Sequence, residues 1–183
     1  MDLPLPATTT ATTRASFAPW LGLAKPGIVV GNAVALAGGY FLGARDGFQL
    51  LSFAGVLTGL SLVVASAGAV NNVIDRDIDQ LMERTRERPM ARGDLGVTEA
   101  LVGAGAAGIA GLALLGWASN LQAVLAAAAG FAVYVFLYSL WLKRGSVHGT
   151  VVGSVSGAMP PLTGYLAATG AFDSTALLLA LAF

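Results

Sequence analysis

The sequence predicts an all-α membrane protein, a bundle of about five full transmembrane helices followed by a truncated sixth. Of its 183 residues, 56% are hydrophobic and only 11% are charged, whereas soluble domains carry about 25% charged residues. Several apolar stretches reach about 20 residues, the length at which an α-helix crosses the hydrocarbon core of a bilayer. The few charged residues lie in the segments between these stretches.

The chain is expected to begin with a disordered cytoplasmic tail over residues 1–23. This segment is rich in proline, threonine and alanine and lacks the apolar core of a signal peptide. Lys25-Pro26 then marks the first helix, because proline is favoured in the first helical turn. Residues 24–183 are expected to form one partial transmembrane domain.

Apolar runs place five full spans and the start of a sixth. The full spans are expected at residues 27–44, 50–74, 98–118, 121–142 and 147–169. The sixth begins near residue 174, and its ten residues cover only about 15 Å of a core of about 30 Å. We therefore expect the sequence to be an N-terminal fragment. The 24 glycines, many of them within spans, would let the helices pack closely.

The loops alternate in charge, which predicts the orientation of the bundle. Loops on one side carry Lys25, Arg76, Arg84, Arg86, Arg88, Arg92, Lys143 and Arg144, and those on the other carry Arg45, Asp46, the turn 119–120 and Asp173. Positive loops stay in the cytoplasm, so the N-terminus is expected there. Because the tail is a poor transit peptide, the expected location is a bacterial inner membrane, with several passes.

Composition excludes several classes of site. There is no cysteine, so disulfides, thiolate metal sites and cysteine nucleophiles are absent. The single histidine, His148, excludes a multi-histidine metal or haem site within the chain. The basic residues lie between spans, so nothing indicates nucleic-acid binding.

The candidate catalytic and metal-binding residues are Asn71, Asp75 and Asp79, at the end of the second span. Their i, i+4, i+8 spacing places them on one helical stripe that turns by about 80° and rises by about 12 Å. Carboxylates are costly at the mouth of a membrane helix, which indicates a use for them. Two carboxylates and an amide oxygen suit Mg²⁺ that also holds phosphate oxygens. The alternative is a solvated helix end balanced by Arg76.

An arginine-rich loop follows the acidic stripe. Arg84 and Arg88 are spaced to share a face of a short loop helix, with Pro89 ending it. Arginine forks beside carboxylates and Mg²⁺ suit a diphosphate leaving group. The alternatives are the positive-inside bias itself and contacts with anionic lipid.

Two further groups have structural alternatives. Tyr138 and Lys143 end the fourth span, where aromatic residues and long cations also anchor helices at a membrane surface. Pro160-Pro161 bends the fifth span, either as a simple kink or to shape a cavity. Lys25 is placed to reach the mouth of such a cavity.

These motifs resemble a known family. The pattern Asn71-x-x-x-Asp75-x-x-x-Asp79 is similar to the first aspartate-rich motif of the UbiA superfamily of intramembrane prenyltransferases. The longer string over residues 71–93 resembles the protohaem IX farnesyltransferase branch, as do Lys25-Pro26 and residues 138–170. The resemblance covers residues 25 to 170.

The resemblance implies a fold and a reaction. Such enzymes are bundles of nine transmembrane helices around a central cavity, with a second acidic motif that would lie beyond Phe183. Mg²⁺ on the acidic stripe would hold farnesyl diphosphate, and the farnesyl group would pass to a vinyl group of haem B, giving haem O. A haem–copper oxidase or haem A synthase would be the protein partner. Tyr138, Lys143 and Lys25 would join the arginines as diphosphate ligands.

Other functions remain open at this point. A quinone or other aromatic acceptor would keep the same chemistry. A cation transporter would carry its ionisable residues near the bilayer midplane, whereas here they gather at one rim; a structural membrane subunit and an inactive truncated chain are the remaining alternatives.

Overall fold

A computed structural model describes residues 17–143 and 149–182. All regular structure in these ranges is helical, which confirms the predicted fold class. The elements are α1 (Ala18–Ala24), α2 (Pro26–Gly43), η1 (Ala44–Asp46), α3 (Leu50–Asp79), α4 (Pro89–Arg92), α5 (Val97–Ala118), α6 (Leu121–Ala132), η2 (Val133–Leu142), α7 (Gly149–Thr169) and α8 (Ser174–Ala182). Arg144 and His148 lie outside the described residues.

Four helical segments of the described chain are long and apolar enough to cross a membrane. They are α2, α3, α5 and the continuous segment Leu121–Leu142, which joins α6 to η2. The expected fifth span corresponds to α7, which has 21 residues but is not among the four. Its glycines, hydroxyl residues and two prolines make it less apolar. The predicted number of spans is therefore not confirmed.

One predicted boundary needs correction. The tail was expected to be disordered through residue 23, but α1 covers Ala18–Ala24, because Leu23 packs in an apolar cluster with Ala69 and Met90. The apolar part of the second span ends near residue 74, and α3 continues beyond it to Asp79, as the predicted helical stripe of Asn71, Asp75 and Asp79 requires. Its last turns remain helical because their carboxylates find partners, described below.

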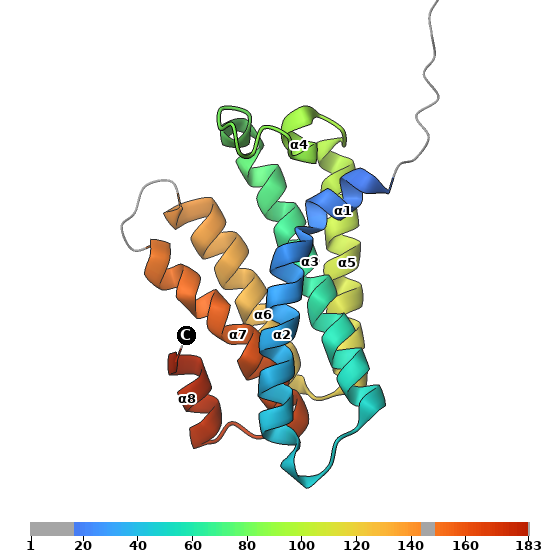
Figure 1. Cartoon of the computed structure of the whole chain (residues 1–183), viewed down its shortest axis with the longest axis vertical. Helices are drawn as coiled ribbons and strands as arrows, with labels where there is room; N and C mark the ends of the chain where they lie inside the picture. The colour runs from blue at the N-terminus through green and yellow to red at the C-terminus, as the bar shows by residue number, and fades with distance from the viewer. Residues whose placement is uncertain (1–16, 144–148, 183) are drawn as a thin grey trace, which may run out of the picture.

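The long helices form a bundle in which α3 is the longest helix and contacts most of the others (Figure 1). Helix α5 packs along α3, α2 packs along α7, and α6 lies against α7. The main core joins α2, α3, α5, α6 and α7 around buried side chains such as Leu36, Leu60 and Leu115. The end of α3 reaches the same end of the bundle as α1 and α4 (Figure 1).

Ser66 joins the two most extensively packed helices. Its hydroxyl is buried and donates to the carbonyl oxygen of Ala104 on α5, at 2.6 Å. We expect Ser66→Ala to lower the free energy of unfolding by about 1 kcal/mol, because one buried interhelical hydrogen bond is lost. Unfolding of the purified protein in mixed detergent micelles measures this. Ser61→Ala is the control, since Ser61 bonds only within its own helix, to Leu57; an equal loss in both variants would contradict the prediction.

Candidate active site

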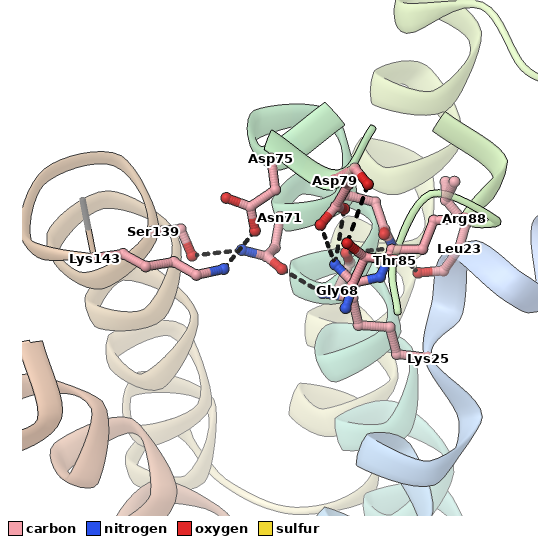
Figure 2. A network of polar contacts seen from close by, with 11 residues as sticks. Leu23, Lys25, Gly68, Asn71, Asp75, Asp79, Thr85, Arg88, Ser139 and Lys143 are labelled. Carbon is pink, nitrogen blue, oxygen red and sulfur yellow. Dashed lines mark hydrogen bonds and ion pairs between the residues drawn. The ribbon is translucent and has the colours of Figure 1, made fainter. Parts of the chain in front are cut away.

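The predicted acidic stripe is buried in the structure. Asn71, Asp75 and Asp79 are 1%, 3% and 4% exposed, and they follow one face of α3 (Figure 2). Asp77, between the two acids, is exposed. A solvated helix end would leave all these carboxylates in water, so burial favours a specific role for the stripe.

Three cationic side chains from three separate segments meet the stripe (Figure 2). Lys143 Nζ lies 2.5 Å from Asp75 Oδ2. A single nitrogen of Arg88, Nη1, donates to both carboxylate oxygens of Asp79, at 2.9 and 2.8 Å. The Lys25 ammonium donates to Asn71 Oδ1. The two ion pairs neutralise carboxylates that would otherwise be costly to bury, and the Lys25 contact supplies a hydrogen bond to the buried amide of Asn71.

Lys25 is held in place by the junction between α1 and α2. Its backbone has φ of 52°, the left-handed region that side chains other than glycine rarely occupy. Asn72 fixes the end of α1, because its amide nitrogen donates to the carbonyls of Leu23 and Gly68 at 2.9 and 3.1 Å. The pKa of Lys25 falls from 10.5 to about 8, chiefly because burial disfavours its charge and then because Arg88 and Lys143 repel it.

The arginine loop reaches the stripe with one arginine only. Residues 80–88 form turns, not the expected loop helix, and Pro89 begins α4 instead of ending a helix, in keeping with the preference of proline for the first helical position. Thr85 Oγ1 donates to the Asp79 carbonyl at 3.1 Å, which ties the loop to α3. Arg88 thereby contacts Asp79, whereas Arg84 is exposed and makes no hydrogen bond or ion pair with the stripe.

The end of the fourth apolar segment is a π-helix, η2, and it supplies Lys143. The Lys143 backbone N–H donates to the carbonyl of Tyr138, five residues back. Ser139, fully buried on η2, accepts a hydrogen bond from Asn71 Nδ2 at 3.1 Å. Tyr138 itself stacks on Tyr134, with ring centroids 5.7 Å apart, and makes no hydrogen bond to the stripe.

An apolar cavity of about 170 Å³ begins one turn below Asn71. It is lined by residues of α2, α3, α6, η2 and α7, among them Ala67, Phe131, Tyr134, Met159 and Pro160. Pro160 of α7 therefore lines this cavity, whereas Pro161 packs against Gly39 of α2. A polar mouth above an apolar hollow suits a ligand with an anionic head and a hydrocarbon tail.

The donor set fits Mg²⁺ only if a substrate completes it. Within residues 17–143 and 149–182, no three carboxylate, histidine or cysteine side chains group closely enough to hold a metal. Asp75, Asp79 and Asn71 Oδ1 are hard oxygen donors, and Mg²⁺ is commonly bound by one or two carboxylates together with substrate phosphates. The residues present therefore fit a Mg²⁺–diphosphate complex better than a bare ion.

Sequence reasoning missed Asn72 and Ser139 as site residues. Ser139 lies four residues before Lys143, just as Asn71 lies four before Asp75, and this shared spacing was the available signal. Asn72 had no such signal, because it anchors the end of α1 only in the three-dimensional arrangement.

Residues 32–183 match the UbiA prenyltransferase family. The chain belongs to this family. Among curated relatives, this UbiA-family chain is 49% identical over 164 residues to protoheme IX farnesyltransferase 2 of Pseudomonas fluorescens, covering 90% of the chain and 56% of the relative. It is 50% identical over 160 residues to protoheme IX farnesyltransferase of Aeromonas salmonicida, covering 87% and 54%. The chain thus spans about half the length of these relatives.

Solved structures share the fold of this UbiA-family chain. A digeranylgeranylglyceryl phosphate synthase superposes with a TM-score of 0.79 at 20% identity, over 90% of the chain and 57% of the synthase. A UbiA homolog from Archaeoglobus fulgidus, bound to GPP and Mg²⁺, superposes with a TM-score of 0.69 at 21% identity, over 88% and 60%. The arrangement of α2 to α8 is therefore a UbiA bundle.

Proposed function

We propose that the protein containing this chain is a Mg²⁺-dependent protohaem IX farnesyltransferase, which converts haem B to haem O. The observation that carries the proposal is the buried stripe of Asn71, Asp75 and Asp79, faced by three cations and set above an apolar cavity. The names of the relatives at about 50% identity support the choice of farnesyl group and haem.

The diphosphate of farnesyl diphosphate would bind at the stripe. Asp75, Asp79 and Asn71 Oδ1 would hold Mg²⁺, which when bound neutralises the diphosphate and promotes its departure. Lys143, Arg88 and Lys25 already lie against these three side chains. In the complex they would turn their charges to the diphosphate oxygens.

The reaction breaks the bond between C1 of the farnesyl chain and oxygen, and the diphosphate leaves with the electron pair. The allylic cation is then attacked by the vinyl group of haem B, which forms the new carbon–carbon bond. Water adds to the resulting cation and loses a proton, giving the hydroxyethylfarnesyl group. The apolar cavity would protect the first cation from water until the acceptor attacks.

The remaining roles and the placement in the cell are also proposals. Arg84 and Tyr138 would bind diphosphate only after movement of the loop or of η2, since neither reaches the stripe. We propose that the end of the bundle with Lys25, Arg88 and Lys143 faces the cytoplasm of a bacterial inner membrane, because cations gather at cytoplasmic ends. A haem A synthase or a haem–copper oxidase would use the product.

The test is production of haem O by the gene product, meaning the protein expressed with any in-frame sequence that follows residue 183. It is expressed in a bacterial strain that lacks its own haem O synthase, and extracted haems are separated by chromatography and weighed by mass spectrometry. We expect a haem heavier than haem B by one farnesyl group and one hydroxyl group. In isolated membranes, EDTA should stop the reaction and added Mg²⁺ should restore it.

Two outcomes would contradict the proposal. Prenylation of an aromatic or quinone precursor, with haem B left unchanged, would favour the other acceptor class. Absence of any prenyl transfer by a folded gene product would reject the proposal that the protein is a prenyltransferase. The 183-residue chain expressed alone is a separate arm, because it spans about half the length of its relatives.

A further inference from the structure

Ser139 is a fully buried hydroxyl on the η2 side of the site, between the backbone of η2 and the side chain of Asn71 (Figure 2). It donates its proton to the carbonyl of Tyr134, at 2.8 Å and five residues back. A hydroxyl has one proton and two lone pairs, so towards Asn71 it can act only as an acceptor. The observed contact, from Asn71 Nδ2 to Ser139 Oγ at 3.1 Å, has this polarity.

The π-helical register of η2 places two of its side chains, those of Ser139 and Lys143, against the stripe on α3. Ser139 meets Asn71 and Lys143 meets Asp75, and both pairs are separated by 68 residues in the sequence. Helix α3 and η2 therefore run side by side in the same direction, with matching four-residue steps. Local π-helical turns are frequent at functional sites, and here the turn brings one neutral and one charged partner to the stripe.

The single hydroxyl proton of Ser139 determines the orientation of the Asn71 side-chain amide, because that proton is already donated to the Tyr134 carbonyl. An amide presents an oxygen on one side and an NH₂ group on the other. Since Ser139 can only accept, it selects the NH₂ group and turns Oδ1 away from η2. On the opposite side the Lys25 ammonium donates to Oδ1, which is where a cation that needs an oxygen ligand would approach.

We propose that Ser139 is a positioning residue for the metal–diphosphate complex, because it holds the amide oxygen of Asn71 towards the bound cation. This inference rests on the proposed function. When Mg²⁺ and diphosphate bind, Lys25 moves from Oδ1 to the diphosphate, and the oxygen is left facing the metal. Without the Ser139 hydroxyl, the amide is free to rotate and to present NH₂, which cannot bind a metal.

Binding of Mn²⁺, a substitute for Mg²⁺, tests the proposal without turnover. The detergent-purified gene product is titrated with Mn²⁺ in the presence of inorganic pyrophosphate, and free Mn²⁺ is measured by electron paramagnetic resonance. We expect Ser139→Ala to weaken Mn²⁺ binding by about tenfold or more, as loss of a partner that orients a ligand usually does. The Mg²⁺ concentration for half-maximal turnover should rise in parallel, with most of the rate recovered at saturating Mg²⁺.

Three variants separate positioning from simple stabilisation. Ser139→Thr keeps the hydroxyl and should restore Mn²⁺ binding, and Ser61→Ala removes a hydroxyl that bonds only to Leu57 and should leave binding unchanged. If Ser139→Ala lowers the unfolding temperature but binds Mn²⁺ normally, the inference is wrong. Asp75→Asn then distinguishes a failure of the proposed function from a failure of the role of Ser139. If Ser139→Ala and Asp75→Asn both bind Mn²⁺ normally, the proposed function is wrong. If Asp75→Asn abolishes binding while Ser139→Ala does not, only the role of Ser139 is wrong.

Discussion

Asp75→Asn in the gene product is expected to lower haem O formation by about a hundredfold or more, because it replaces an anionic ligand of the proposed metal–diphosphate complex with a neutral amide. The substitution keeps the size of the side chain and removes its charge. Asp75 is 3% exposed, and its partner Lys143 is about one-third exposed. Lys143 can therefore turn to water, so the variant should still fold.

The matched control for Asp75→Asn is Asp77→Asn, on the same helix two residues away. Asp77 is exposed, and it does not share the face of α3 that carries the stripe. Haem O is quantified in extracts of cells that express each variant at equal level, checked by immunoblot and by size-exclusion elution in detergent. Normal haem O from Asp75→Asn, or an equal loss from Asp77→Asn, would remove the stripe from the proposed mechanism.

The helical stripe itself could be predicted from sequence because it depends on one helix only. Helical geometry places residues four apart on one face, and the cost of placing carboxylates at the end of an apolar helix indicates a use for them. Both arguments are local. They correctly bring together Asn71, Asp75 and Asp79, which the structure buries on one face of α3.

Partners from other segments were harder to predict. The charge pattern places Lys25, Arg88 and Lys143 at one end of the bundle but does not assign each to a carboxylate. Arg84 and Arg88 were expected to act together on a loop helix. The loop forms turns instead, so a four-residue spacing no longer means a shared face, and only Arg88 contacts the stripe.

The π-helical register of η2 was beyond sequence reasoning for a physical reason. An apolar run such as residues 133–142 satisfies an α-helix and a π-helix equally well in its composition. The choice depends on packing of η2 against α7, the next helix along the chain, and against α3, which lies far away in sequence. The contact of Ser139 with Asn71 depends on that choice, so the spacing of Ser139 and Lys143 could indicate the residue but not its partner.

Gly39→Ala is expected to destabilise the bundle strongly, because α2 and α7 cross with their backbones in contact. A Cβ atom at Gly39 would lie 1.9 Å from the carbonyl oxygen of Pro161, and one at Gly164 would lie 2.1 Å from the carbonyl oxygen of Leu36. These are reciprocal contacts, in which each helix accepts a carbonyl of the other, and small residues permit such close approach in membranes.

The expected loss for Gly39→Ala is about 3 kcal/mol of unfolding free energy, because a rigid backbone carbonyl must shift to make room. Gly38→Ala is the matched control, since a Cβ there meets nothing within 4 Å, and it should change stability by less than about 1 kcal/mol. Unfolding in detergent mixtures, followed by circular dichroism, measures both. Because α2 and α7 also form walls of the cavity, Gly39→Ala should reduce haem O formation together with stability, whereas equal stability of the two variants would mean that the helices cross less closely than the structure has them.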